Sequence, residues 1–172
     1  MTTRTIYLAG GCYWGVEKYC SNIAGVLETE VGFANGHLDD PIYVQVKKGD
    51  TGHAETVRVV YDADALPLEK LLRLFFRIID PTSFEKQGED VGNQYRTGVY
   101  WTDAADETVV RAELARLQTL YSAPLAVEAC PLDRFYPAEE YHQKYLDTTP
   151  GGYCHVPWDM IDAVRTVDLS EI

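Results

Sequence analysis

A cysteine that follows two glycines is the first residue of this chain whose position suggests chemistry. Cys12 comes after Gly10 and Gly11, where a strand-like segment gives way to a predicted helix. Backbone N–H groups at the start of a helix have no partners within the helix, and they favour the thiolate, the nucleophilic form of cysteine. The glycines let another molecule approach the backbone closely. The position predicts a nucleophile; the alternative is a small cysteine buried at a turn.

Aromatic side chains form a second group of candidates. Tyr13 and Trp14 follow the cysteine in the first turn of the predicted helix. They would form an apolar socket for a substrate, or they would pack in the core. Tyr95 is expected to share a strand face with Val99 and Trp101. A buried tyrosine hydroxyl normally needs a partner, which would be a substrate oxygen or a backbone carbonyl.

One carboxyl group is predicted to point toward the core. Glu55 shares one face of the predicted strand 54–61 with three apolar or aromatic side chains. Burial without a partner raises the pKa of a carboxyl group, so that the neutral acid persists at neutral pH and can act as a general acid. The alternative is a residue at a strand end that reaches solvent or pairs with Arg58 or Arg96.

The other three cysteines differ in their freedom to move. Cys20 lies eight residues after Cys12, a rise of about 12 Å along a helix. A disulfide needs Cα atoms within about 7 Å, so these two cannot pair directly. Cys20 and Cys130 are predicted to be structural. Cys154 lies in a glycine-flanked tail that we expect to be mobile, and a mobile cysteine can reach another thiol, as a resolving cysteine must.

The elements that must position these residues alternate between strands and helices. Strands outnumber βαβ crossovers, which favours a mixed sheet with packed helices. The residues after Gly151 are expected to be irregular, and Asp103 is the expected N-cap of a helix. The predicted strands are 3–9, a strand around 31–33 that ends at 35–36, 54–61, 95–101 and 125–129; the predicted helices are 12–22, 68–79, 104–121 and a short one opened by Pro137; the predicted loops are 37–52 and 80–93.

Composition limits the function classes. A chain of 172 residues with 46% hydrophobic residues predicts one folded domain. Its net charge of −12 argues against nucleic acids and anionic membrane surfaces as partners. No segment reaches the roughly 20 apolar residues of a membrane helix. No secretory signal of the usual length is visible either, so we expect a cytoplasmic chain or one already processed.

Four motifs in register resemble those of the peptide methionine sulfoxide reductase A family. They are spread over nearly the whole chain and occur in the family's order. The motifs are GCYWGVE at 11–17, GDTGHAE at 49–55, DVGNQYR at 90–96 and YHQ at 141–143. The resemblance implies an α+β fold, a two-layer α/β sandwich whose mixed sheet has a ferredoxin-like core, in a single catalytic domain 1–172 with a mobile, irregular tail 151–172.

The resemblance also implies roles for individual residues. Cys12 would be the nucleophile that reduces the S-epimer of methionine sulfoxide, free or in proteins, as a repair of oxidative damage. Tyr13 and Trp14 would enclose the S-methyl group of the substrate. Cys154 resembles the recycling cysteine of the family, which implies a Cys12–Cys154 disulfide that thioredoxin reduces. We expect a monomer that needs no metal or organic cofactor. The remaining site residues would be Glu55, Tyr43 and Tyr95 around the sulfoxide oxygen, and Asp90 holding solvent and the substrate backbone.

The chain departs from the family pattern at two places. Tyr13 replaces the usual phenylalanine, and its added hydroxyl must find a partner or point to water. No second cysteine follows Cys154, so a single recycling disulfide is the simpler expectation.

Other functions use the same residues differently. A cysteine hydrolase or transferase would pair Cys12 with a histidine base, His53 or His142. A zinc site would use Cys154 with His155 and His142, although no C-x-x-C or H-x-x-x-H spacing supports it. An acidic peptide-binding module would need no turnover at all. Its aromatic groove would be lined by Tyr13, Trp14, Tyr43 and Tyr95.

Overall fold

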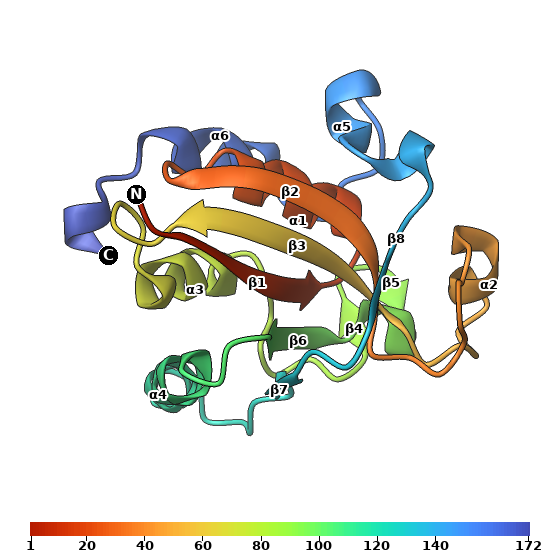
Figure 1. Ribbon diagram of the computed structural model, residues 1–172, viewed down its shortest axis with the longest axis horizontal. Helices are drawn as coiled ribbons and strands as arrows, with labels where there is room; N and C mark the ends of the chain where they lie inside the picture. Colours follow the sequence, from red (N-terminus) through yellow and green to blue (C-terminus); the bar gives the residue numbers. More distant parts are fainter.

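Alternating apolar residues build a six-stranded sheet in the computed structural model, which describes residues 1–172 (Figure 1). The strand order is β7-β6-β1-β3-β2-β8. Only the β6–β7 pair is parallel, so the sheet is mixed, as predicted. The strands of this sheet are β1 (Thr3–Gly10), β2 (Val26–Ala34), β3 (Ala54–Asp62), β6 (Thr97–Trp101), β7 (Glu128–Pro131) and β8 (Phe135–Pro137).

Helices cover one face of this sheet. Figure 1 shows α1 (Tyr13–Ser21) and α3 (Leu68–Phe76) behind the central strands. A cluster of 30 buried hydrophobic residues fills the space between these layers. None of the helices combines the length and apolar character needed to span a membrane. The other helices are α2 (Tyr43–Lys47), α4 (Asp106–Gln118), α5 (Tyr145–Thr148) and α6 (Trp158–Ala163), with 3-10 turns η1 (Asn93–Tyr95), η2 (Glu140–His142), η3 (Val164–Thr166) and η4 (Leu169–Glu171).

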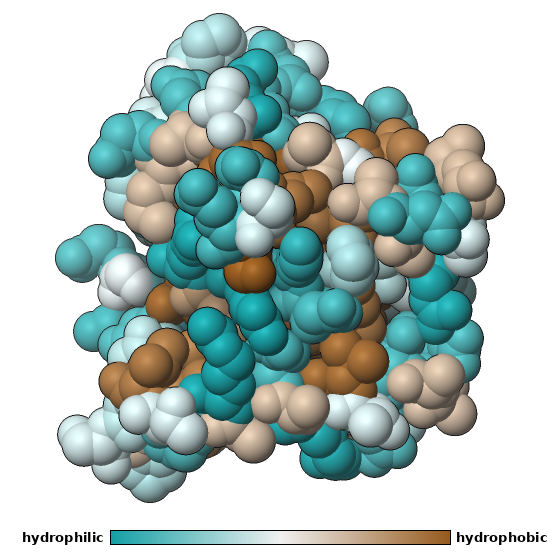
Figure 2. Space-filling view, turned by 90° about the vertical axis from the view of Figure 1, so that its left-hand side faces the viewer, coloured by the Kyte–Doolittle hydropathy of each residue, from teal (hydrophilic) through white to brown (hydrophobic).

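The two ends of the molecule differ in character. Strand β1 ends beside the two-stranded hairpin of β4 (Lys86–Gln87) and β5 (Asp90–Val91), with α2 farther toward the same end, whereas both termini lie at the other end (Figure 1). Figure 2 shows that the terminal end is largely hydrophilic, with small apolar areas separated by polar side chains. Cys12, which follows the two glycines at the end of β1, therefore lies at the end of the molecule that carries the short elements.

Short elements account for most differences from the sequence prediction. The predicted loop 37–52 contains α2, and the predicted loop 80–93 contains the β4–β5 hairpin. The tail is not irregular throughout, because it includes α6, whose Ile161 is fully buried. Elements of two to six residues are too short to display a hydrophobic period.

Some element boundaries were also wrong. Pro137 ends β8 instead of opening a helix. Helix α4 begins later than predicted, with Ala105 at the N-cap position, and Asp103 accepts a hydrogen bond from its backbone N–H at 2.9 Å. Tyr121, the predicted last residue of this helix, lies beyond the end of α4 and is 40% exposed.

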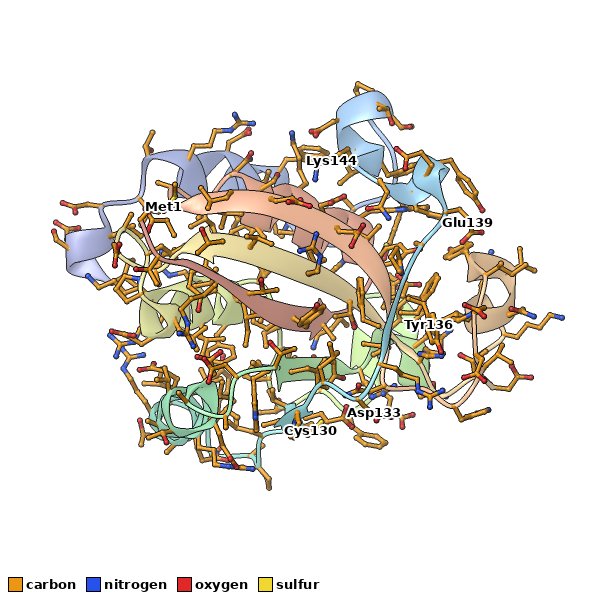
Figure 3. The ribbon with its side chains drawn as sticks, in the orientation of Figure 1. Met1, Cys130, Asp133, Tyr136, Glu139 and Lys144 are labelled. Atoms are coloured by element: carbon orange, nitrogen blue, oxygen red, sulfur yellow. The ribbon has the colours of Figure 1, made fainter.

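A buried carboxylate ties the segment after β8 to α1 and β2. Glu17 is 2% exposed and accepts hydrogen bonds from the backbone N–H of Lys144 at 2.8 Å and from the Thr29 hydroxyl at 2.9 Å. The Lys144 ammonium lies 3.1 Å from the same carboxylate and also donates to the Thr29 carbonyl. Figure 3 labels Lys144 just before α5, above the edge of the sheet. This contact holds η2 and α5 against α1.

Replacing Glu17 should therefore weaken the fold. We expect Glu17→Ala to lower the free energy of unfolding by about 2–4 kcal/mol, because it leaves buried donors without an acceptor. Glu107→Ala is the matched control, since it removes an exposed pair with Arg111, which is worth less than about 1 kcal/mol. Urea unfolding of both variants measures the difference. Equal losses in the two variants would refute this role for Glu17.

Candidate active site

Cys12 occupies the N-cap position of α1, directly after the Gly10-Gly11 turn. Its backbone has φ −56° and ψ 123°, outside the helical region, and its side chain is 7% exposed. The side chain makes no capping hydrogen bond to α1. The predicted position at a helix start is thus the observed one.

The protonation state of this thiol differs from the prediction. Burial raises the pKa of Cys12 well above its usual value, and the nearby carboxyl of Glu55 raises it further. The backbone N–H of Trp14 lowers the pKa, but it does not compensate for the loss of hydration. The resting site therefore holds a thiol instead of the thiolate that the helix start alone suggests.

Glu55 is the buried acid of the site. It is 1% exposed, and its Oε1 accepts a hydrogen bond from the backbone N–H of Tyr13 at 3.2 Å. Its Oε2 is buried and has no partner. Burial raises the pKa of Glu55 to about 8, so the carboxyl is neutral at neutral pH. The alternative ion pairs are wrong, because Arg58 binds glutamates of β2 and Arg96 binds Glu128.

Two phenols share the surroundings of this acid. Tyr43 begins α2, and its backbone N–H donates to the Glu139 carboxylate at 3.1 Å. Tyr95 lies in η1, so the prediction that it shares a strand face with Val99 and Trp101 is wrong. Burial raises both pKa values, that of Tyr43 to about 12, and the Glu55 carboxyl raises them further. The short elements η1 and α2 thus bring both hydroxyl groups toward the same acid.

The tail closes the site from the other side. Asp90 of β5 accepts a hydrogen bond from the Tyr153 hydroxyl at 2.8 Å. The next residue, Cys154, donates its thiol proton to the carbonyl of Val156 at 3.1 Å. A Cβ placed on Gly15 would lie 3.0 Å from the Cys154 sulfur. The close approach that the glycines allow is therefore made by the chain's own tail, which reaches the first turn of α1.

An aromatic wall stands beside the cysteine; we use this name for Tyr13, Trp14, Tyr43, His142 and Tyr145. Trp14 stacks on Tyr145 with centroids 3.8 Å apart, and its indole N–H donates to Nδ1 of His142 at 3.0 Å. The rings of Tyr43 and His142 are 4.2 Å apart. The sequence reasoning did not assign His142 and Tyr145 to this wall. The YHQ motif was the signal for the histidine, but nothing local connects it with Trp14.

The remaining cysteines lie away from these groups. Cys20 is fully buried in the core side of α1. Cys130 is in β7, where the amide of Asn35 contacts its sulfur at 3.6 Å, and Figure 3 shows it at the far edge of the sheet from Glu139. No group of three or more His, Cys, Asp or Glu side chains is arranged to hold a metal ion. The zinc set of Cys154, His155 and His142 does not converge.

Comparisons with known proteins match this chain nearly end to end. The family model described as "Peptide methionine sulfoxide reductase" covers residues 4–168. Peptide methionine sulfoxide reductase MsrA of Lachnoclostridium phytofermentans is 54% identical over 162 residues, which are 94% of this chain and 98% of that protein. Reduced Mxr1 from Saccharomyces cerevisiae has a TM-score of 0.84 and 38% identity, with 88% of each chain covered. The complex of Mxr1 with Trx2 gives a TM-score of 0.60 at 24% identity, covering 83% and 84%, and shows a similar fold.

The hydroxyl of Tyr13 gives a direct test of the wall's packing. It is buried without a partner, so we expect Tyr13→Phe to raise the free energy of unfolding by about 1–2 kcal/mol. Tyr19→Phe in the same helix is the matched control. It removes a hydroxyl that donates to the Leu74 carbonyl at 2.8 Å, and it should cost about 1 kcal/mol. Urea unfolding of both variants measures these two changes in the free energy of unfolding. A destabilised Tyr13→Phe would show that the Tyr13 hydroxyl has a partner.

Proposed function

The chain belongs to the peptide methionine sulfoxide reductase family, and from this premise we propose that it reduces methionine S-sulfoxide through a Cys12 sulfenic acid and a Cys12–Cys154 disulfide. The family is one of enzymes that reduce methionine sulfoxide. The observation that carries the mechanism is the unpartnered Oε2 of Glu55, a neutral acid buried beside the thiol. It is a proton donor with nothing to donate to until a substrate enters.

The aromatic wall orients the substrate. Its rings would take the S-methyl group between Tyr13 and Trp14, which places the sulfoxide oxygen toward Glu55. The hydroxyl groups of Tyr43 and Tyr95 would donate to that oxygen as it gains negative charge. Such donors accelerate a reaction most where water is excluded and charge develops. Asp90, joined to the tail through Tyr153, would hold solvent and the substrate backbone.

The protons balance within the reductive step. The Cys12 sulfur attacks the sulfoxide sulfur while Glu55 gives its proton to the oxygen. The resulting carboxylate then takes the proton that the buried thiol must lose, so Glu55 is regenerated. Oxygen then passes to the Cys12 sulfur as a sulfenic acid, the S–O bond of the sulfoxide and the new S–S bond break, and methionine leaves. A thiol with a raised pKa is compatible with this step, because the two proton transfers depend on each other.

Recycling would use the tail. The Cys154 thiol attacks the sulfenic acid, and water leaves as the disulfide forms. An external dithiol then reduces this disulfide by thiol–disulfide exchange. We choose a thioredoxin as the reductant, the class of partner seen with yeast Mxr1. The position of Cys154 supports this order of events, because its sulfur already lies against Gly15 in the first turn of α1.

The hydrolase alternative lacks a suitable base. Both ring nitrogens of His53 are engaged, one by the Gly36 N–H at 3.0 Å and the other by the Leu38 carbonyl at 2.7 Å. Nδ1 of His142 is occupied by the indole of Trp14. A peptide-binding module would give no reason for a buried neutral carboxyl beside a thiol.

Broader features of the chain complete the proposal. We infer a single catalytic domain, which one main hydrophobic cluster supports. The antiparallel order β6-β1-β3-β2, with α1 and α3 on one face, supports a ferredoxin-like core. We also propose that the protein acts as a monomer in the cytoplasm, with a tail that moves during recycling.

Removing the acid proton should disable the reductive step. We expect Glu55→Gln to slow single-turnover methionine release by about 10²–10⁴-fold, and less at low pH, where solvent supplies protons. The wild-type rate should fall as pH rises through about 8, because Glu55 loses its proton there. Glu30→Gln is a matched control, since its side chain pairs with Arg58 away from the site. A wild-type-like rate for Glu55→Gln at neutral pH would exclude the acid role.

The function and the recycling cysteine are tested together by counting products without reductant. With the S-epimer of a methyl sulfoxide peptide, the wild-type enzyme should release one methionine and lose the Cys12 and Cys154 thiols as a mapped disulfide. Cys154→Ser should release one methionine, form no disulfide and stall with thioredoxin as the only reductant. Cys130→Ser should retain thioredoxin-dependent turnover. Release of no methionine would overturn the function, and sustained thioredoxin-driven turnover by Cys154→Ser would overturn the choice of cysteine.

A further inference from the structure

An imidazole with no part in the proposed reaction lies across the start of α1. His155 follows the recycling cysteine, and its Nε2 lies 2.9 Å from the carbonyl oxygen of Gly10. A Cβ placed on Gly11 would be 3.1 Å from the same nitrogen. The ring therefore rests on the glycine turn that leads into Cys12.

The hydrogen bond to Gly10 assigns the tautomer of this ring. A carbonyl oxygen only accepts, so Nε2 carries the proton and Nδ1 carries the lone pair. Nδ1 is buried and has no partner. Burial lowers the pKa of His155 below its usual 6.5, so the ring is neutral at neutral pH. The charged group that faces it is Asp90 of the hairpin, and a Cβ placed on Gly88 of the same hairpin would lie 3.6 Å from the Cβ of His155.

Nδ1 of His155 and the sulfur of the recycling cysteine both lie near Gly15. A Cβ placed on Gly15 would lie 3.6 Å from Nδ1 of His155 and 3.0 Å from the sulfur of Cys154. Both atoms therefore flank one point above the first turn of α1, while the Nε2 end of the ring faces Gly10 and Gly11. The Cys154 thiol is protonated, because it donates to the Val156 carbonyl and burial raises its pKa. It must lose that proton before it can act as a nucleophile.

We propose that His155 is the proton acceptor of the recycling step, taking the thiol proton of Cys154 on Nδ1 as the disulfide forms. This inference rests on the proposed function. The Cys154 sulfur forms a bond to the Cys12 sulfur with the electron pair left by its proton, and the S–O bond of the sulfenic acid breaks. The hydroxide that leaves takes the proton back from the imidazolium and departs as water. Cys154 is oxidised, the sulfenic sulfur is reduced, and His155 returns to its neutral form.

The substitution His155→Gln separates a base from a structural contact. A glutamine amide still donates to the Gly10 carbonyl, but its nitrogen has no basic lone pair. In rapid-quench single turnovers, we expect disulfide formation to slow by about 10²-fold or more, a much larger factor than any change in methionine release. His37→Gln, at an exposed loop position, is the control and should change neither step. Equal slowing of both steps in His155→Gln would overturn the proposal.

The pH dependence provides a second readout that a structural role would not move. Wild-type disulfide formation should be independent of pH above the pKa of His155 and should fall below it, as the imidazole becomes protonated. In His155→Gln the rate should rise with pH, because the thiol must ionise unaided. Matching profiles for the two proteins would refute the base role.

The wild-type measurement keeps the test decisive if the variant fails to fold. A wild-type rate that shows no ionisation near or below pH 6.5 would also overturn the proposal. The two hypotheses fail differently. If the wild-type enzyme forms no Cys12–Cys154 disulfide, the proposed recycling is wrong and the role of His155 falls with it. If that disulfide forms at the same rate in His155→Gln, only the inference about His155 is wrong.

Discussion

The site depends on a carboxyl group that is buried without a cation. An unpaired buried carboxylate is expensive, so Glu55 retains its proton where an exposed glutamate would lose it. No arginine neutralises this carboxyl group, because Arg58 forms an ion pair with a glutamate of β2 and Arg96 forms one with Glu128. Burial raises the pKa values of the Cys12 thiol and of the two phenols, and the Glu55 carboxyl raises them further. A cation beside Glu55 would have favoured the carboxylate, giving an ion pair and no proton donor.

The tail completes the site by contact with backbone instead of by insertion into a cleft. Glycines at the end of β1 and in the first turn of α1 leave room for Cys154 and His155 to lie directly on the segment that carries Cys12. The hairpin holds the tail there through Asp90 and Tyr153. Residues from opposite ends of the chain thus meet at the start of α1.

The sequence was sufficient for the features that repeat along the chain. Alternation placed Glu55 on the buried face of β3, and the glycine turn placed Cys12 at the start of α1. It was insufficient where an element is shorter than a hydrophobic period, which is why Tyr95 was assigned to a strand instead of η1. The state of the Cys12 thiol was also beyond local reasoning, because its pKa depends on burial and on a carboxyl 43 positions away in the chain.

The buried proton of Glu55 also links the stability of the fold to acidity. The pKa is about 8 in the folded chain and about 4.5 when the group is hydrated, so between these values the folded chain holds a proton that the unfolded chain has released. The contribution of Glu55 to the free energy of unfolding is then largest below pH 4.5. It declines as pH rises to about 8, with a slope of at most about 1.4 kcal/mol per pH unit. Protonation of Glu55 therefore stabilises the folded chain and also keeps the buried acid in its proton-donating form. Alkaline conditions ionise Glu55, so they lower the free energy of unfolding and remove the proton of the buried acid.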